Sequence, residues 1–313
     1  MGASRMILDD AADAQRPAIG DMVLDHVAHF LPDMAAAEEA LGRMGFGLTP
    51  LSHQMHRATP DGPLVSAGTA NRTAMLARGY LEFLATTGDT PNAARLRAAM
   101  ARYTGVHLVC FGTADAAAVQ ARITRAGFDP PPMVALQRAV EQGDGTTDTA
   151  RFAVVRPAPE RMREGRIQFV EHLAPAAIWQ RRFLDHPNGA RVLSGVIVAV
   201  PDLDEARARW ESLTGIACAP QGAFRVLRTG RGRVLLGDAR TVADAFGMEP
   251  PALPWIAGPI LGVADLARTG TLLRDGGIAA LRQTATLLVA AAPPTLGGLY
   301  AFEPMSALDA AGR

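Results

Sequence analysis

Apolar and polar residues follow one another along this chain in a unit that occurs four times. Each unit starts with an apolar strand and continues into a helix whose apolar residues are three and four positions apart. A Gly-Phe or Gly-Ile pair ends each helix. The helices read PDMAAAEEALGRM, TADAAAVQARITRA, PDLDEARARWESLT and ADLARTGTLLRDG. Repetition of this kind predicts one structural module used four times.

Strand-like segments follow every helix. They are residues 68–77 and 80–86, 150–156 and 166–172, 224–228 and 233–237, and 284–290 and 299–302. Each helix begins beside an Asp or Thr that suits an N-cap and ends at a glycine that suits a left-handed C-terminal residue. The module is therefore βαβββ. A sheet with a helix on one face leaves its other face uncovered, and pairing two modules closes that face into a cup.

The predicted fold class is α+β, with four βαβββ modules paired into two domains, each a curved mixed sheet that forms a cup. We expect an N-terminal extension over residues 1–20, a metal-binding domain over 21–180 and a second, degenerate domain over 191–305. The linkers fall near residues 185–191 and in the Pro-rich stretch 243–254.

Four residues at equivalent places of the first two modules carry the candidate chemistry. His26 and His107 lie on the first strands, and Glu82 and Glu171 lie on the last strands. A glutamate on an apolar inner strand is costly to bury unless it is paired or bound to a metal. Two such carboxylates facing one cup would repel each other, and a cation between them removes that repulsion.

This pattern predicts one divalent metal ion held by two imidazoles and two carboxylates. Nickel, zinc, cobalt, manganese and ferrous iron all suit such ligands, and the set leaves positions open for water or substrate. Because side chains alternate between the faces of a strand, His29 and His172 are expected to point away from this ion. A single His or Glu at a strand end is more often structural, and only the repeat favours the metal.

Candidate substrate-binding residues are Asn71 and Arg72 in the middle of a strand, and His56 and Arg57 before a Pro-Asp-Gly turn. The Arg72 guanidinium suits a carboxylate or a phosphate, although a structural ion pair explains it equally well.

Composition narrows the function classes. The chain has 313 residues, of which 49% are hydrophobic, and a formal net charge of zero. No basic tract with interleaved aromatics indicates nucleic acid, and no apolar run is long enough to span a membrane. The two cysteines, Cys110 and Cys218, do not form a disulfide framework, which favours the cytoplasm. We expect a monomer or homodimer that acts on a small molecule.

The sequence resembles the vicinal oxygen chelate superfamily, in particular its glyoxalase-like branch. The resemblance covers about residues 22–302 and is most specific in LDHVAH, HRATPDGP, GTANRTAML, GYLEFL, FVEHLAPAAIWQ and HPNGA. It implies that the two His and two Glu match the metal ligands of bacterial-type glyoxalase I. It also implies that Glu171 is the catalytic base of a lyase or isomerase that moves a proton beside a metal-chelated oxygen. The glutathione-binding residues of that enzyme have no counterpart that can be placed here.

Two alternatives remain open on the same fold. One is an extradiol-type ring-cleaving dioxygenase, which uses ferrous iron with two His and one Glu, so a fourth protein ligand counts against it. The other is a non-catalytic protein that binds small molecules and confers resistance. In the third and fourth modules the ligand positions are expected to hold non-ligating residues: Gly195 and Gly258 for the histidines, and Leu236 or Gly237 and Ala301 for the glutamates.

Overall fold

The computed structural model describes residues 10–57 and 63–305, and at residues 56, 57 and 64 it describes the backbone alone. In these residues the predicted four βαβββ modules are confirmed. The first module comprises β1 (Met22–Leu31), α2 (Met34–Arg43), β2 (Ser52–Arg57), β3 (Leu64–Met75) and β4 (Tyr80–Thr86). The second comprises β5 (Gly105–Thr113), α4 (Ala116–Arg125), β6 (Val134–Glu141), β7 (Thr147–Val155) and β8 (Arg166–His172).

The second half of the chain repeats this order. Its third module comprises β9 (Ala190–Val200), α5 (Leu203–Thr214), β10 (Cys218–Gln221), β11 (Phe224–Arg228) and β12 (Arg233–Asp238). The fourth comprises β13 (Trp255–Val263), α7 (Leu266–Asp275), β14 (Ala280–Gln283), β15 (Leu288–Ala291) and β16 (Leu299–Pro304). Short 3-10 helices lie at η1 (Asp13–Gln15), η2 (Pro159–Arg161), η3 (Pro175–Ala177) and η4 (Arg181–Phe183).

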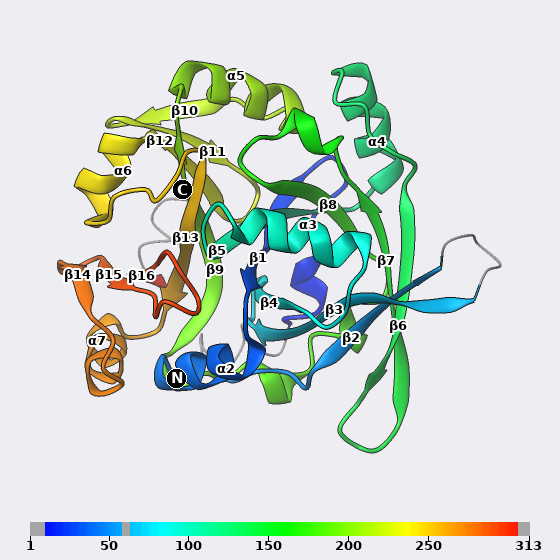
Figure 1. Ribbon diagram of the computed structural model, residues 1–313, viewed down its shortest axis with the longest axis horizontal. Helices are drawn as coiled ribbons and strands as arrows, with labels where there is room; N and C mark the ends of the chain where they lie inside the picture. The colour runs from blue at the N-terminus through cyan, green and yellow to red at the C-terminus, as the bar shows by residue number, and fades with distance from the viewer. Residues whose placement is uncertain (1–9, 58–62, 306–313) are drawn as a thin grey trace.

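Each pair of modules forms one curved sheet (Figure 1). The strand order is β2-β3-β4-β1-β5-β8-β7-β6 in the first cup and β10-β11-β12-β9-β13-β16-β15-β14 in the second. The two central strands of a cup run antiparallel, and the last strand of each module runs parallel to its first. Among the named strands the cups join at one residue pair, Ile256 of β13 beside Val106 of β5, and isolated bridges also connect Val23 with Arg231 and Arg78 with Val192.

The ends of the module helices follow the predicted chemistry. An aspartate carboxylate accepts hydrogen bonds from the first turn of each helix, at Asp33, Asp115, Asp202 and Asp265. A glycine with positive φ stands just beyond each helix, at Gly45, Gly127, Gly215 and Gly277. The Phe or Ile that follows each glycine packs into or against the main hydrophobic core, so the helix end and the core contact are specified together.

The outer faces of the two cups share one hydrophobic core with the four module helices. Val27 and Phe111 of the first cup belong to the same buried cluster as Trp210 and Leu261 of the second half. The inner faces are separate: one small apolar cluster fills part of the first cup and another fills the second. The two cups are therefore joined back to back, and each opens independently.

Two further helices cover the inner faces, and the sequence patterns did not predict either. Helix α3 (Pro91–Met100) links the first two modules (Figure 1). Its Leu96 belongs to the apolar cluster of the first cup. Helix α6 (Ala239–Phe246) links the last two and packs Phe246 into the second. Pro91 directly after the Thr90 cap was an available signal for the start of α3. No helix within residues 10–57 and 63–305 has the length and apolar character needed to cross a membrane.

A buried carboxylate from the first half also fastens the two halves together. Glu164, which is fully buried, accepts two hydrogen bonds from Arg209 of α5, at 2.7 and 3.0 Å, and one from Trp210 Nε1 at 2.9 Å. Arg209 also pairs with Glu205, whose side chain is about half exposed. One guanidinium therefore bonds to a buried acid and to an accessible one.

These two partners of Arg209 should differ in their contribution to stability. Glu164→Ala leaves two buried donors without an acceptor and should lower the free energy of unfolding by about 3 kcal/mol. Glu205→Ala should lower it by less than about 1 kcal/mol, because water replaces the exposed partner. Urea titration followed by circular dichroism measures both, and equal losses would contradict the assignment.

Candidate metal centre

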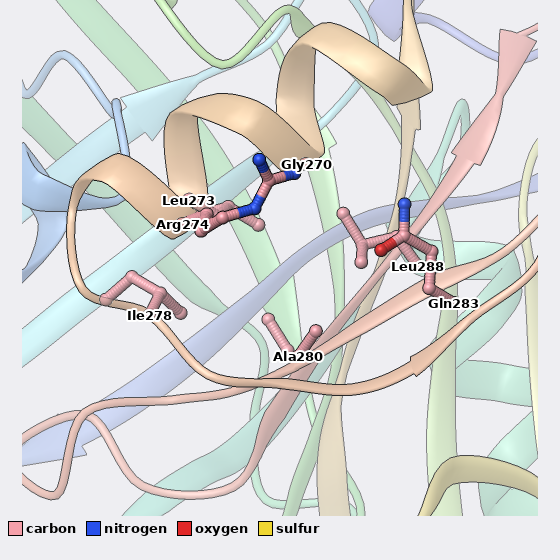
Figure 2. Close-up of a pocket in the computed structure, with 8 residues that line it drawn as sticks. Gly270, Leu273, Arg274, Ile278, Ala280, Gln283 and Leu288 are labelled. Carbon is pink, nitrogen blue, oxygen red and sulfur yellow. The ribbon is translucent and has the colours of Figure 1, made fainter.

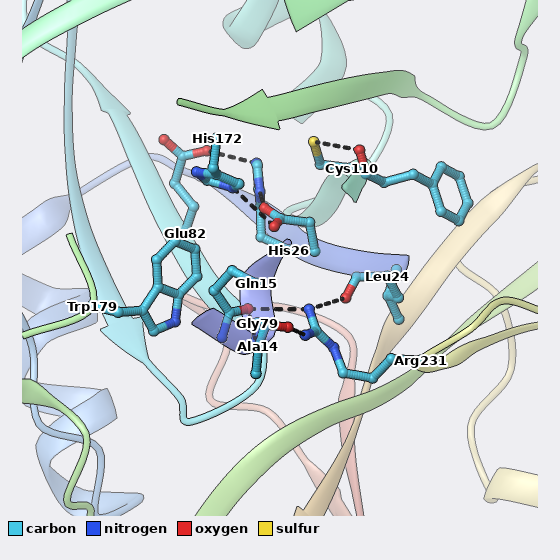
Figure 3. Close-up of polar contacts among 12 residues, drawn as sticks. Ala14, Gln15, Leu24, His26, Gly79, Glu82, Cys110, His172, Trp179 and Arg231 are labelled. Atoms are coloured by element: carbon cyan, nitrogen blue, oxygen red, sulfur yellow. Dashed lines mark hydrogen bonds and ion pairs between the residues drawn. The ribbon is translucent and has the colours of Figure 1, made fainter. Parts of the chain in front are cut away.

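A β-bulge in β1 places two adjacent polar residues at the floor of the first cup. The register of β1 against β5 shifts between Leu24 and His26, so Asp25 is an extra residue at this point. The Asp25 carboxylate is fully buried; its Oδ1 lies 2.6 Å from His26 Nδ1 and its Oδ2 lies 2.9 Å from His172 Nε2 (Figure 3). A single carboxylate thus connects imidazoles from β1 and β8.

The charges of this cluster are coupled. Burial alone would raise the pKa of Asp25, but its interactions with His172 and His26 hold that pKa well below its ordinary value. Burial alone would lower the pKa of His26, but Cys110 and Asp25 raise it well above its ordinary value. Burial raises the pKa of the Cys110 thiol, against the opposing effect of His26. The cluster therefore holds a buried carboxylate whose charge is balanced by imidazole.

Cys110 of β5 pairs with His26 across the sheet and completes a compact set of potential ligands. One ligand atom each from Asp25, His26 and Cys110 lie within 4.8 Å of one another, and the described residues contain no other such group. A thiolate, an imidazole and a carboxylate are donors that suit zinc, ferrous iron or cobalt. The donor set therefore fits a metal ion, and this is the candidate metal centre.

Glu82 of β4 stands at the edge of this centre. Its Oε2 lies 3.9 Å from His26 Nε2, and its Oε1 accepts a hydrogen bond from Asn71 Nδ2 at 2.5 Å. The Tyr80 ring stacks on the His26 imidazole with 4.3 Å between the centroids. These neighbours fix the His26 ring in the plane that directs Nε2 toward the Glu82 carboxylate (Figure 3).

Arg231 of the second half contacts the base of this region. It lies in the turn between β11 and β12, and its backbone oxygen accepts a hydrogen bond from Leu24 N at 2.7 Å. Its guanidinium donates to Gln15 Oε1 at 3.1 Å and to Ala14 O at 2.5 Å (Figure 3). Arg231 of the second half therefore holds the start of β1 and connects it to η1.

The structure brings together two of the four predicted ligands, His26 and Glu82, and places the other two elsewhere. His107 Nε2 donates to Tyr103 O at 2.7 Å, and its ring stacks on Tyr103. Glu171 Oε2 accepts from Ala116 N at 2.9 Å and so caps the start of α4 on the outer face of the sheet. The predicted four-ligand site does not form, and Glu171 does not reach the cup as its base.

The four-ligand prediction failed because it aligned the second module with the first incorrectly. The alignment in the structure differs from the sequence alignment by one residue. A Cβ on Gly79 would lie 2.6 Å from Asp25 O, and a Cβ on Gly165 would lie 2.6 Å from His107 O. These two glycines precede the last strands of their modules, so the structural counterpart of His107 is Asp25. A shift by one residue along a strand turns every side chain to the other face.

The same register identifies the true counterparts in the second module. The residues after the two glycines, Tyr80 and Arg166, pair with His26 and Leu108 respectively. Counting on along each strand, Gln168 corresponds to Glu82. The second module thus supplies Leu108 and Gln168 where the first supplies a histidine and a glutamate.

The sequence did not predict three residues of the candidate centre. His172 was assigned correctly to the face opposite Glu171, but that face is the inner one. Asp25 gave no signal, because alternation cannot reveal a bulge. Cys110 enters the sequence analysis only as a cysteine outside a disulfide framework, because its partner His26 comes from another strand and no local motif connects the two. His29 lies outside the centre, 2.9 Å from the Tyr300 hydroxyl.

Of the predicted substrate-binding residues, Asn71 reaches the centre through Glu82. Arg72 points to the other face, where it pairs with Glu38 of α2 at 3.2 Å and donates to Thr49 O at 2.9 Å. Of the two roles considered for Arg72, binding an anion or forming a structural ion pair, the structure shows the ion pair. The side chains of His56 and Arg57 lie outside the described residues.

The second cup has no comparable polar set in the part of the chain that the structure describes. Gly195 and Gly258 stand at the place of His26, and Ala301 stands at the place of Glu82, as expected. In the third module the residue at the place of Glu82 is Leu235, rather than Leu236 or Gly237. Arg233 pairs with Gly195 as Tyr80 pairs with His26, and Leu235 follows Arg233 by two residues as Glu82 follows Tyr80. Leu235, Ala301 and α6 side chains form the apolar filling of this cup.

A small pocket in the second half lies between α7 and the hairpin β14–β15 (Figure 2). Leu273, Ile278, Ala280 and Leu288 supply most of its wall, with Arg274 and Gln283 beside it. It contains no group of acid, base or ligand side chains, so we do not assign it a chemical role.

The model of the glyoxalase-like domain family matches residues 24–234. The chain therefore belongs to the glyoxalase-like domain family, and its fold is that of the vicinal oxygen chelate superfamily, as the resemblance predicted. No curated protein matches the chain in sequence.

Solved structures share this fold at low identity. A hypothetical protein from Staphylococcus aureus is 12% identical, with a TM-score of 0.61 over 90% of this chain and 99% of that one. A mutant of 4-hydroxymandelate synthase from Streptomyces coelicolor is 16% identical, with a TM-score of 0.54 over 90% and 93%. A fusion of a xylose isomerase-like TIM barrel with 4-hydroxyphenylpyruvate dioxygenase is 15% identical, with a TM-score of 0.55 over 91% of this chain and 49% of that one.

The placement of Glu171 predicts a structural effect without a chemical one. Glu171→Ala removes an acceptor and a negative charge from the N-terminus of α4 and should lower the free energy of unfolding by about 1 kcal/mol. Its metal content, measured by mass spectrometry after purification without chelator, should equal that of the wild type. Loss of the metal in this variant would contradict this placement and indicate that Glu171 is a metal ligand.

Proposed function

We propose that this chain is a metal-dependent enzyme that acts on a small molecule in the first cup. Its reaction would be of the lyase or isomerase type, in which a proton moves beside a carbonyl or hydroxyl oxygen. The observation that carries the proposal is the buried group of Asp25, His26 and Cys110, whose ligand atoms lie within 4.8 Å of one another beside the Glu82 carboxylate.

Asp25, His26 and Cys110 would hold the ion, and the thiolate favours zinc, ferrous iron or cobalt over manganese. When bound, a divalent ion supplies Lewis-acid polarisation of an oxygen and stabilises the negative charge that develops on it. Asp25 also bonds to His172, so this second imidazole keeps the Asp25 carboxylate oriented.

Glu82 is the group best placed to move the proton. Its carboxylate lies outside the three-residue set but within 3.9 Å of His26, and Asn71 bonds to only one of its oxygens. The second oxygen can accept a proton from a carbon held over the centre, and the hydrogen bond from Asn71 keeps the carboxylate aimed at that position.

A dioxygenase reaction is the second candidate. It is favoured by the names of two proteins that share the fold, 4-hydroxymandelate synthase and the 4-hydroxyphenylpyruvate dioxygenase fusion. A single histidine with a cysteine differs from the two-histidine iron site expected of that chemistry. Iron in the purified protein, together with oxygen uptake in the presence of catechols or aromatic 2-oxo acids, would replace the first proposal with this one.

Metal content tests the centre directly. Protein purified without chelator or nickel affinity resin should contain about one ion per chain, and His26→Ala and Cys110→Ser should lose most of it. The matched controls are His53→Ala, at an exposed position, and Cys218→Ser, at the other free cysteine. A metal-free wild type, or equal losses in the controls, would favour the non-catalytic binding protein.

The variant Glu82→Gln tests whether Glu82 acts as the base or as a metal ligand. The variant should keep its metal and lose about 10²- to 10⁴-fold in the rate at which the C–H beside a carbonyl exchanges with D₂O, because an amide cannot accept the proton. Proton NMR of a panel of 2-hydroxy and 2-oxo acids measures this exchange. Full exchange in Glu82→Gln would remove Glu82 from the reaction, and loss of metal would make it a ligand instead.

A further inference from the structure

Two guanidinium groups in the first cup lack the acid partners that several other enclosed arginines have. Unlike Arg231, they also have no backbone or amide acceptor at short distance among the residues that the structure describes. Arg209 pairs with Glu164, Arg233 with Glu303 and Arg72 with Glu38. Within the described part of the chain, Arg156 and Arg166 form no ion pair with any carboxylate. A guanidinium carries five N–H donors, so this leaves most of their hydrogen-bonding capacity unused.

The contacts that these two arginines do make are weak. The Nε of Arg156 is buried without a hydrogen-bond partner. Arg166 reaches one acceptor, Asn92 Oδ1 of α3, at 3.5 Å, and its guanidinium lies 5.6 Å from the centre of the Phe30 ring. Burying a cation without an acceptor is costly, and sites that are built this way commonly serve an anion.

Their positions place them on the same inner face as the candidate metal centre. Arg166 pairs with Leu108 of β5, in the row that continues through Ala28 of β1 to Glu82 of β4. Arg156 follows the last residue of β7, and continuing that register puts it beside Gln168, whose neighbour across the sheet is Cys110. Two strand spacings, about 10 Å, separate the backbones of Arg156 and Cys110.

The electrostatics agree with this geometry. Burial, followed by repulsion from Arg156, lowers the pKa of Arg166 to about 10, and Arg95 of α3 adds to the repulsion. Burial also lowers the pKa of Arg156, to which the Arg95 charge contributes. The two guanidiniums therefore lie near enough to repel each other, and the attraction of Glu82 offsets only part of the effect of burial on Arg166.

We propose that Arg156 and Arg166 form an anion subsite, and that the substrate is a small organic anion whose carboxylate or phosphate they bind. The inference rests on the proposed function and adds the substrate class to it. With its anionic group between the two guanidiniums, a molecule of a few carbon atoms would extend over Cys110 and His26 toward Glu82. Arginine suits this task because its planar fork can hold both oxygens of one acid group.

Calorimetric titration of the wild-type protein with malonate and with inorganic phosphate, at constant ionic strength, tests the subsite. We expect one anion per chain to bind, and we expect binding to weaken as salt is raised. Preference for malonate indicates a carboxylate substrate, and preference for phosphate indicates a phosphorylated one. Binding of neither anion would overturn the proposal.

The variants Arg156→Gln and Arg166→Gln should each weaken binding at least about tenfold. Arg240→Gln is the control, because that side chain is 91% exposed on α6, and it should bind as the wild type does. Arg166→Lys keeps the charge, so it should retain weak binding even if a glutamine variant fails to fold. Equal binding in the wild type and all variants would assign the anion to another place and overturn the subsite.

Metal analysis of the same samples separates this inference from the proposed function. A wild type that contains metal but binds neither anion refutes the subsite alone. A wild type that binds an anion through Arg156 and Arg166 but holds no metal refutes the metal-dependent reaction and leaves the subsite standing.

Discussion

The buried carboxylate of Asp25 is the interaction on which the first cup depends. A charge with no exposure is stable only with partners, and here it has two, one imidazole from each module. Those bonds fix His26 and His172 at the same time, so β1 and β8, which lie on either side of β5, cannot move apart without leaving a charge unpaired. The orientation of His26, its approach to Cys110 and its distance from Glu82 all follow from this arrangement.

The bulge that admits Asp25 recurs in the other modules, where His107, Ser194 and Ala257 are the extra residues, but only the first module combines it with a histidine and a glutamate on the inner face. Without an extra residue in β1, the side chain before His26 would point to the outer core. In the second half the counterparts of His26 and Glu82 are glycine, leucine and alanine, and α6 fills the space with apolar side chains. One cup thus retains polar side chains at its floor while the other serves the stability of the shared core. This division explains why a duplicated fold shows a single polar centre among the residues that the structure describes.

The fold was almost fully predictable, whereas the site was only half predictable. Helical and strand periodicities, Asp caps and Gly ends are local signals, and they gave the module order and several strand bounds to the residue, such as β4 and β8. The site depends on strand register, which local patterns do not contain. Aligning His26 with His107 agrees with the sequence pattern. The close approach of Gly165 to the His107 carbonyl shows that this alignment is wrong by one residue. Helices α3 and α6 were missed because nothing in the repeat requires them.

The backbone bond between Leu24 and Arg231 has a consequence for how such a chain can change over generations. In a fold made by duplication, one copy is often free to be lost once it has no chemistry of its own. Here the turn between β11 and β12 supplies the hydrogen-bond acceptor for a residue immediately before Asp25, and its guanidinium holds Gln15 of the N-terminal region. The half without the polar set supports the half that contains it, so a gene encoding only the first half would encode Asp25, His26 and Cys110 without the contacts that position them.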